Sequence, residues 1–197
     1  MISNTNKDEL SKKELIKNLH SSESNEWYTP CEIIEAAREV MGEIDLDPAS
    51  CEEANEVVGA ANFFTIEIDG LAQKWFGRVW LNSPYGYFNN KPGVSCAGVW
   101  SHSLLERYKK GEIKEAIFLV NANVGDGWWM PLFNQLPVCL INKRIKFRPP
   151  SGSNKKNRPS KGNSVFYIGN QFEKFRDVFE RKYELGTVVH ASAAKYK

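Results

Sequence analysis

Short apolar runs that alternate with amphipathic segments constrain the fold of this chain more than any other feature. The clearest run, residues 116–121, is apolar at every position except the last, which is typical of a strand buried inside a sheet. Further strands are expected at residues 44–46, 78–81, 138–142 and 164–168. Helices are expected at residues 30–41, 51–57, 99–109 and 172–182. Strands that alternate with helices predict an α/β fold with a mostly parallel sheet and helices on both faces.

The length of 197 residues fits one domain, which we place at residues 25–185. A polar arm, residues 1–24, precedes this domain, and a tail, residues 186–197, follows it. The longest apolar runs are far shorter than a membrane span, and the N-terminus is polar. We therefore expect a cytoplasmic protein without a transmembrane or secretory segment.

Metal binding is not expected from the cysteines and histidines. Cys31, Cys51, Cys96 and Cys139 are widely separated, without a Cys-x-x-Cys pair, and the three histidines are scattered. A zinc site usually places such residues in closely spaced pairs. Reduced thiols are the expectation for a cytosolic protein.

Charge is distributed unevenly along the chain. Residues 23–69 hold thirteen acidic residues and one basic residue, whereas residues 143–161, the basic segment, hold eight basic residues and no acidic one. Interspersed Gly, Ser, Asn and Pro indicate a loop, and a loop of this charge favours phosphate contacts over simple solvation. We expect it to bind a polyanion such as a nucleic acid from one side, through Lys155, Lys156 and Arg158.

The segment 79–85 marks the expected site. Its apolar strand residues end in Asn82, Ser83 and Pro84, followed by Tyr85. In open α/β sheets, ligands bind outside the carboxyl ends of strands. An amide oxygen beside an aromatic ring suits a planar base with an exocyclic amine. The alternative is a strand that simply ends in a proline turn.

Residues 29–32 have the pattern of a helix start. Thr29 is suited to the N-cap, Pro30 to the first helical position and Glu32 to a capping box. Gly42 is placed where it can end the helix.

Four segments together resemble a known family. Residues 26–30, 46–50, 69–75 and 79–85 occur in the order and spacing of phage-type DNA adenine-N6 methyltransferases, and residues 111–123 and 144–147 resemble later segments of that family. The resemblance spans residues 26–169. It implies a Rossmann-like methyltransferase fold that binds S-adenosylmethionine and methylates an adenine flipped out of DNA.

The resemblance also implies which residues hold the cofactor. In that family Asp47 would accept from the cofactor's ammonium group, and Asp69 from its adenine amine. The implied cofactor-binding residues are Tyr28, Thr29, Pro30, Asp47, Pro48, Ala49 and Asp69. The usual glycine-rich turn is absent after Asp47, so the partner of the ribose stays unassigned, with Glu52, Glu53 and Glu56 as candidates.

The implied catalytic residues are Asn82, Ser83, Pro84 and Tyr85. The target amine would donate to the Asn82 side chain and to the main-chain carbonyl of Ser83. Serine stands where the family usually has proline; it keeps that carbonyl and loses only the φ restraint of the ring. Tyr87 and Phe88, in the loop that follows, are candidates for DNA contact.

Three alternatives stay open at this point. The methylated amine could belong to cytosine N4 or to a protein glutamine, although asparagine at the first motif position favours adenine and the basic segment favours nucleic acid. The chain could also be a non-catalytic DNA-binding or cofactor-binding relative, with Ser83 as a sign of decay. Asn82, Tyr85, Asp47 and Asp69 are all present, which speaks against that reading.

Overall fold

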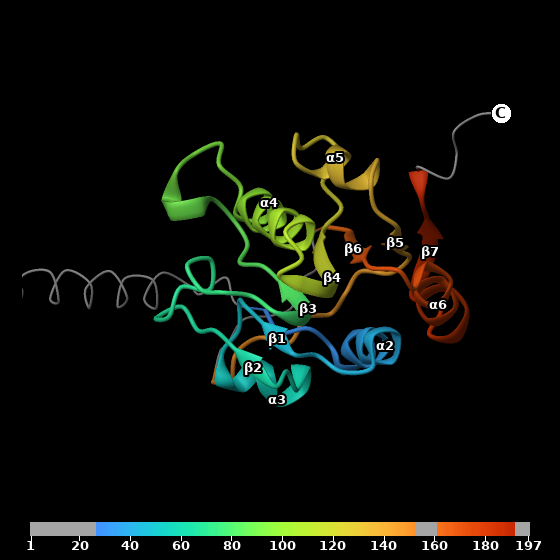
Figure 1. Cartoon of the computed structure of the whole chain (residues 1–197), viewed down its shortest axis with the longest axis horizontal. Helices are drawn as coiled ribbons and strands as arrows, with labels where there is room; N and C mark the ends of the chain where they lie inside the picture. Colours follow the sequence, from blue (N-terminus) through green and yellow to red (C-terminus); the bar gives the residue numbers. More distant parts are fainter. Residues whose placement is uncertain (1–26, 153–160, 192–197) are drawn as a thin grey trace, which may run out of the picture.

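A single mixed sheet organises the computed structural model, which describes residues 27–152 and 161–191 (Figure 1). Within these residues, seven strands follow the order β2-β1-β3-β4-β6-β5-β7. The strands are β1 (Leu46–Asp47), β2 (Asn62–Phe63), β3 (Gly77–Asn82), β4 (Ile113–Asn121), β5 (Val138–Ile141), β6 (Asn163–Ile168) and β7 (Gly186–Val189). The expected α/β fold is therefore confirmed.

The direction of the strands changes halfway across the sheet. Strands β2, β1, β3 and β4 pair in parallel, whereas β6 pairs antiparallel with both β4 and β5, and β7 antiparallel with β5. Five strands thus point one way and two the other. Because β5 ends and β6 begins at the carboxyl edge of the parallel strands, the intervening basic segment starts and ends at that edge.

Helices cover both faces, as Figure 1 shows. One face carries α2 (Cys31–Met41), α3 (Glu52–Val58), α6 (Phe172–Arg176) and the π-helical turn η2 (Asp177–Lys182). The other carries α4 (Cys96–Lys109) and α5 (Trp129–Phe133). Side chains along each strand alternate between these faces: Trp80 and Leu119 pack on the α2 side, and Leu81 and Phe118 on the α4 side.

Helix α2 follows its sequence pattern except at its start. Its apolar face is buried, and Gly42, with φ of 87°, ends it. The helix begins at Cys31, with Pro30 before it, so Pro30 is not its first residue and Thr29 is not its N-cap. The Thr29 hydroxyl instead accepts a hydrogen bond from Asn82 Nδ2.

The sheet extends beyond the expected end of the domain. β7 lies in the segment 186–197 that the sequence assigned to a tail, and it pairs along β5 from Ile141 opposite Gly186 to Val138 opposite Val189. Its four residues alternate between buried and more exposed positions, but a run of four residues is too short to identify a strand from the sequence. The expected arm, residues 1–24, lies outside the described residues.

The cysteines are all free thiols, and Cys96 and Cys139 are buried. Within residues 27–152 and 161–191, no three His, Cys, Asp or Glu side chains gather as metal ligands would. In the same part of the chain, no helix combines the length and the apolar character needed to cross a membrane.

Candidate active site

The carboxyl ends of β1, β3 and β4 lie side by side and carry polar side chains. Asp47 ends β1, Asn82 ends β3 and Asn121 ends β4. The register places Leu46 opposite Val79 and Asn82 opposite Leu119. Two cavities open at this edge, as expected for a ligand site in an α/β sheet.

The first cavity, which we call the Asp47 cavity, has a volume of about 630 Å³. Its walls include six of the seven residues that the sequence assigned to the cofactor: Tyr28, Thr29, Asp47, Pro48, Ala49 and Asp69. The seventh, Pro30, is not among its lining residues. The motif residues Asn82 and Tyr85 line the same cavity, so the two predicted groups meet in one place.

Asp47 is a buried carboxyl that lines this cavity. It is 3% exposed, and Ala49 N–H donates to its Oδ1 at 3.1 Å. Burial raises the pKa of Asp47 from its usual 3.8 to about 7, although the Ala49 hydrogen bond opposes the rise. A buried carboxyl of this kind gains most from a cationic ligand that enters the cavity.

A close backbone contact fixes the Asp69 loop against the β1 turn. A Cβ added to Gly70 would lie 1.8 Å from the Pro48 carbonyl oxygen, so only glycine fits there. The indole N–H of Trp75 donates to the Gly70 carbonyl at 2.7 Å. Asp69 itself is exposed at the cavity wall, and its Oδ1 accepts from Leu71 N–H. The segment 69–75 is therefore a scaffold that places one carboxylate.

Asn82 is held in one amide orientation. Its Nδ2 donates to the Trp27 carbonyl at 3.3 Å and to Thr29 Oγ1 at 3.4 Å. Because a backbone carbonyl only accepts, the amide nitrogen must face Trp27. Asn82 Oδ1 is left on the other side, where the Tyr85 hydroxyl donates to it at 3.3 Å.

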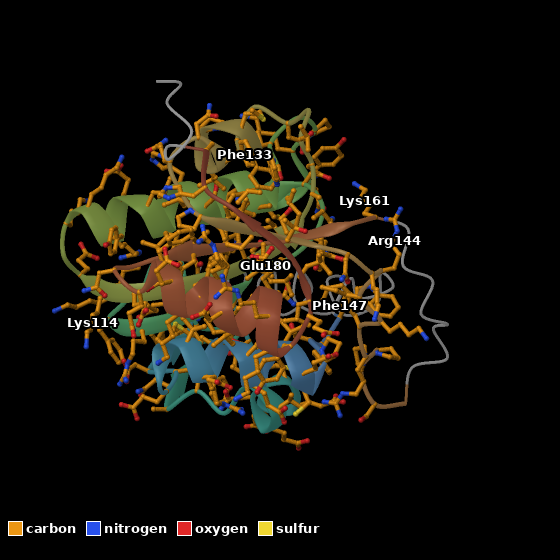
Figure 2. All side chains as sticks on the ribbon, turned by 90° about the vertical axis from the view of Figure 1, so that its right-hand side faces the viewer. Lys114, Phe133, Arg144, Phe147, Lys161 and Glu180 are labelled. Atoms are coloured by element: carbon orange, nitrogen blue, oxygen red, sulfur yellow. The ribbon has the colours of Figure 1, made fainter. Side chains whose placement is uncertain are left out.

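Tyr85 forms an aromatic pair that the sequence did not predict. Its ring lies edge-on to Phe147, with centroids 6.2 Å apart and planes at 77°. Burial raises the pKa of the Tyr85 phenol, so the hydroxyl stays neutral and can donate. Phe147 lies in the segment 144–147, which carried a family resemblance but no assigned role. Figure 2 shows Phe147 on the same side of the molecule as Arg144 and Lys161.

The second cavity, which we call the Asn121 cavity, has a volume of about 620 Å³. It shares Ser83, Pro84, Tyr85 and Tyr87 with the Asp47 cavity, so both cavities meet at the motif. Its far wall contains Asn121, Asn123, Asp126, Trp128 and Lys161. In that wall the Asp126 carboxylate accepts from Asn123 Nδ2 at 2.9 Å and from the Trp128 indole at 3.1 Å.

The expected DNA-contacting residues occupy different places. Tyr87 is 61% exposed and lines both cavities. Phe88 packs partly buried against the core on the α4 side and lines the Asp47 cavity. Lys155, Lys156 and Arg158 lie outside the described residues.

The expected ribose partners do not line the Asp47 cavity. Glu53 accepts hydrogen bonds from the Ser151 N–H at 3.0 Å and from its hydroxyl at 2.7 Å. Nearby, Tyr28 and Arg148 exchange backbone hydrogen bonds at 2.8 and 2.9 Å. These contacts attach the start of the basic segment to α3 and to the wall of the cavity, which is a structural role for Glu53.

Comparison with protein families agrees with this arrangement. A family model described as DNA N-6-adenine-methyltransferase (Dam) matches residues 17–193. The match includes all the residues that form the two cavities and the motif between them. Among curated proteins, no sequence matches the chain closely enough to count as a relative.

Proposed function

The chain belongs to the DNA N-6-adenine-methyltransferase (Dam) family, and we propose that its site transfers a methyl group from S-adenosylmethionine to N6 of an adenine flipped out of double-stranded DNA. The observation that carries this proposal is the orientation of Asn82 in the wall of the Asp47 cavity. The Trp27 carbonyl holds its amide nitrogen, so its oxygen is left on the side of Tyr85, a residue that lines both cavities. The order of the sequence motifs supports a phage or prophage type within the family.

The Asp47 cavity suits the cofactor in size and in chemistry. Its volume of about 630 Å³ falls within the range of small-ligand sites. Asp47 would hold the ammonium group, and exposed Asp69 would accept from the adenine amine, while Phe64, Leu71 and Trp100 provide apolar walls. When bound, S-adenosylmethionine supplies a methyl group on a positively charged sulfur.

Asn82 and Ser83 prepare the target amine. The lone pair of an adenine amine is delocalised into the ring, which makes it a poor nucleophile. Asn82 Oδ1 and the Ser83 carbonyl accept hydrogen bonds from the two N–H groups of the amine. These bonds localise the lone pair of the nitrogen, which then faces the methyl donor. An amide oxygen has two lone pairs, so Asn82 Oδ1 can accept from the amine while it keeps the Tyr85 hydroxyl. Positioning then supplies much of the rate.

The Asn121 cavity is the place for the flipped nucleotide. A base must leave the duplex to reach the motif, and that costs a few kcal/mol. Tyr85 lines this cavity, and stacking a base on its ring would contribute about 1–3 kcal/mol. Ser83 and Tyr85 line this cavity and the Asp47 cavity alike, so a base bound there lies next to the cofactor.

The basic segment is proposed to hold the DNA backbone. Both of its ends lie at the carboxyl edge of the sheet, and exposed Lys161 lines the Asn121 cavity. Phosphate contacts by Lys155, Lys156 and Arg158 would position the duplex without reading its bases.

The test is transfer of a tritiated methyl group to unmethylated duplex DNA by the wild type and by Asn82→Ala. The variant should lose transfer and keep its affinity for S-adenosylmethionine in a calorimetric titration, because Asn82 acts on the amine. Asn134→Ala makes the same change at an exposed position outside both cavities and is expected to behave as the wild type. If Asn82→Ala retains most of the transfer, the proposal is wrong.

A further inference from the structure

A second asparagine stands beside the catalytic motif, and we propose that it recognises the target base. In this proposal Asn121 donates a hydrogen bond to the ring nitrogen next to the adenine amine. It rests on the proposed function, because it adds a contact to the same substrate. Asn121 ends β4, lines the Asn121 cavity and is only partly buried.

The amide of Asn121 is held in one orientation by its neighbour Asn163. Asn163 is 3% exposed, and its Nδ2 lies 3.5 Å from the Val120 carbonyl and 3.3 Å from Asn121 Oδ1. The backbone carbonyl only accepts, so Asn163 must direct its N–H groups to this side. Asn121 Oδ1 is therefore the acceptor, and its Nδ2 faces away from Asn163.

The Nδ2 group of Asn121 is left as a donor. Among residues 27–152 and 161–191, no group accepts a hydrogen bond from it. Asn82 shows the opposite arrangement, because its Nδ2 is occupied by the Trp27 carbonyl and its oxygen is presented. The two asparagines are thus fixed as a complementary pair, one presenting an acceptor and the other a donor.

Strand register brings this pair to the same side of the sheet. Leu119 is the register partner of Asn82, and Asn121 follows Leu119 by two residues. Side chains two residues apart point to the same face, about 7 Å apart along the strand. Both asparagines therefore stand on the α2 face at the carboxyl edge, on neighbouring strands.

Adenine presents the pattern that this pair would bind. Its exocyclic amine donates, and the ring nitrogens on either side of it, N1 and N7, accept. With the amine on Asn82 Oδ1, a donor on the adjacent strand end can reach one of these nitrogens. The alternative is that Asn121 only joins the ends of β4 and β6 through Asn163. In that case the effect of an Asn121 substitution on methyl transfer would be the same for every target base.

The test combines a protein change with a change of single atoms in the substrate. A duplex that the wild type methylates is prepared with adenine, 1-deazaadenine or 7-deazaadenine at the target position, and kcat/KM is measured for the wild type and for Asn121→Ala. Loss of one hydrogen bond should lower kcat/KM of the variant on adenine about tenfold. One of the two analogues should lower kcat/KM of the wild type by a similar factor. It should leave kcat/KM of Asn121→Ala unchanged, because the variant already lacks the contact.

Two control proteins separate recognition from folding. Asn121→Asp keeps the shape but replaces the donor with an acceptor, so it should lose more activity than Asn121→Ala while melting at a similar temperature. Asn134→Ala should match the wild type on all three duplexes. The inference is overturned if both analogues lower kcat/KM of Asn121→Ala by the same factor as kcat/KM of the wild type. If the wild type transfers no methyl group to any duplex, the proposed function fails first and this inference fails with it.

Discussion

Asp47 places a titrating carboxyl in the wall of the Asp47 cavity, and replacing it with asparagine should change the pH dependence of stability. Asparagine has the same shape and keeps the oxygen that accepts from Ala49 N–H. The folded protein holds the Asp47 proton up to a pKa of about 7, whereas the unfolded chain releases it near 3.8. Between these values the folded state binds more protons, so the free energy of unfolding falls as pH rises.

The magnitude follows from the two pKa values. Each pKa unit corresponds to about 1.4 kcal/mol, so the wild type should lose on the order of 4 kcal/mol of this contribution between pH 4 and 7. The asparagine side chain carries no charge at any pH, so the Asp47→Asn variant lacks this loss. It should be the more stable of the two proteins at pH 7.5 and still bind the cofactor less tightly, because it cannot pair with an ammonium group.

The assay is urea denaturation of both proteins at intervals from pH 4.5 to 7.5, without cofactor. Other titrating groups are common to both, so the difference between the two unfolding free energies isolates Asp47. That difference should grow steadily in favour of Asp47→Asn up to about pH 7. Parallel curves would show that Asp47 is ionised throughout and would refute the reasoning about its burial.

Three further substitutions test the surroundings of the site. Gly70→Ala places a Cβ against the Pro48 carbonyl, so it should destabilise the protein by about 1–3 kcal/mol in urea denaturation and weaken cofactor binding; unchanged values would mean that the loop can move aside freely. Ser83→Pro should give equal or faster methyl transfer, because Pro84 already favours an extended backbone at Ser83, and a large loss of rate would assign a specific task to the serine. Lys161→Ala should reduce the slope of log affinity for DNA against log salt by about 0.9, whereas Lys114→Ala, at the opposite side of the molecule, should leave the slope unchanged; equal slopes in all three proteins would exclude a phosphate contact by Lys161.

Local patterns predicted the elements and the edge of the sheet at which the site lies. The periodicity of α2 and the apolar runs of β3 and β4 depend on neighbours in sequence, so these elements were expected near their observed bounds. Because ligands in open α/β sheets bind at the carboxyl ends of the strands, the site was expected at Asn82. Asp47 and Asn82 line one cavity at that edge. Four-residue β7 gave too little pattern to be recognised.

Contacts between distant residues could not be predicted in this way. The Thr29 hydroxyl pairs with Asn82, 53 positions away, although locally it has the form of a helix cap. The orientation of Asn121 depends on Asn163, 42 residues further on. Both contacts form because the fold brings distant segments together, and the local sequence pattern carries no information about which segments meet.

Asn82 and Ser83 are proposed to present the N6 amine of an adenine to the methyl donor. The most direct measurement is to incubate the protein with S-adenosylmethionine carrying a labelled methyl group and with unmethylated duplex DNA, digest the DNA to nucleosides and identify the labelled product. We expect label in N6-methyldeoxyadenosine alone with the wild type, and no labelled nucleoside with Asn82→Ala. Label in N4-methyldeoxycytidine, or none in DNA from the wild type, would contradict this proposal.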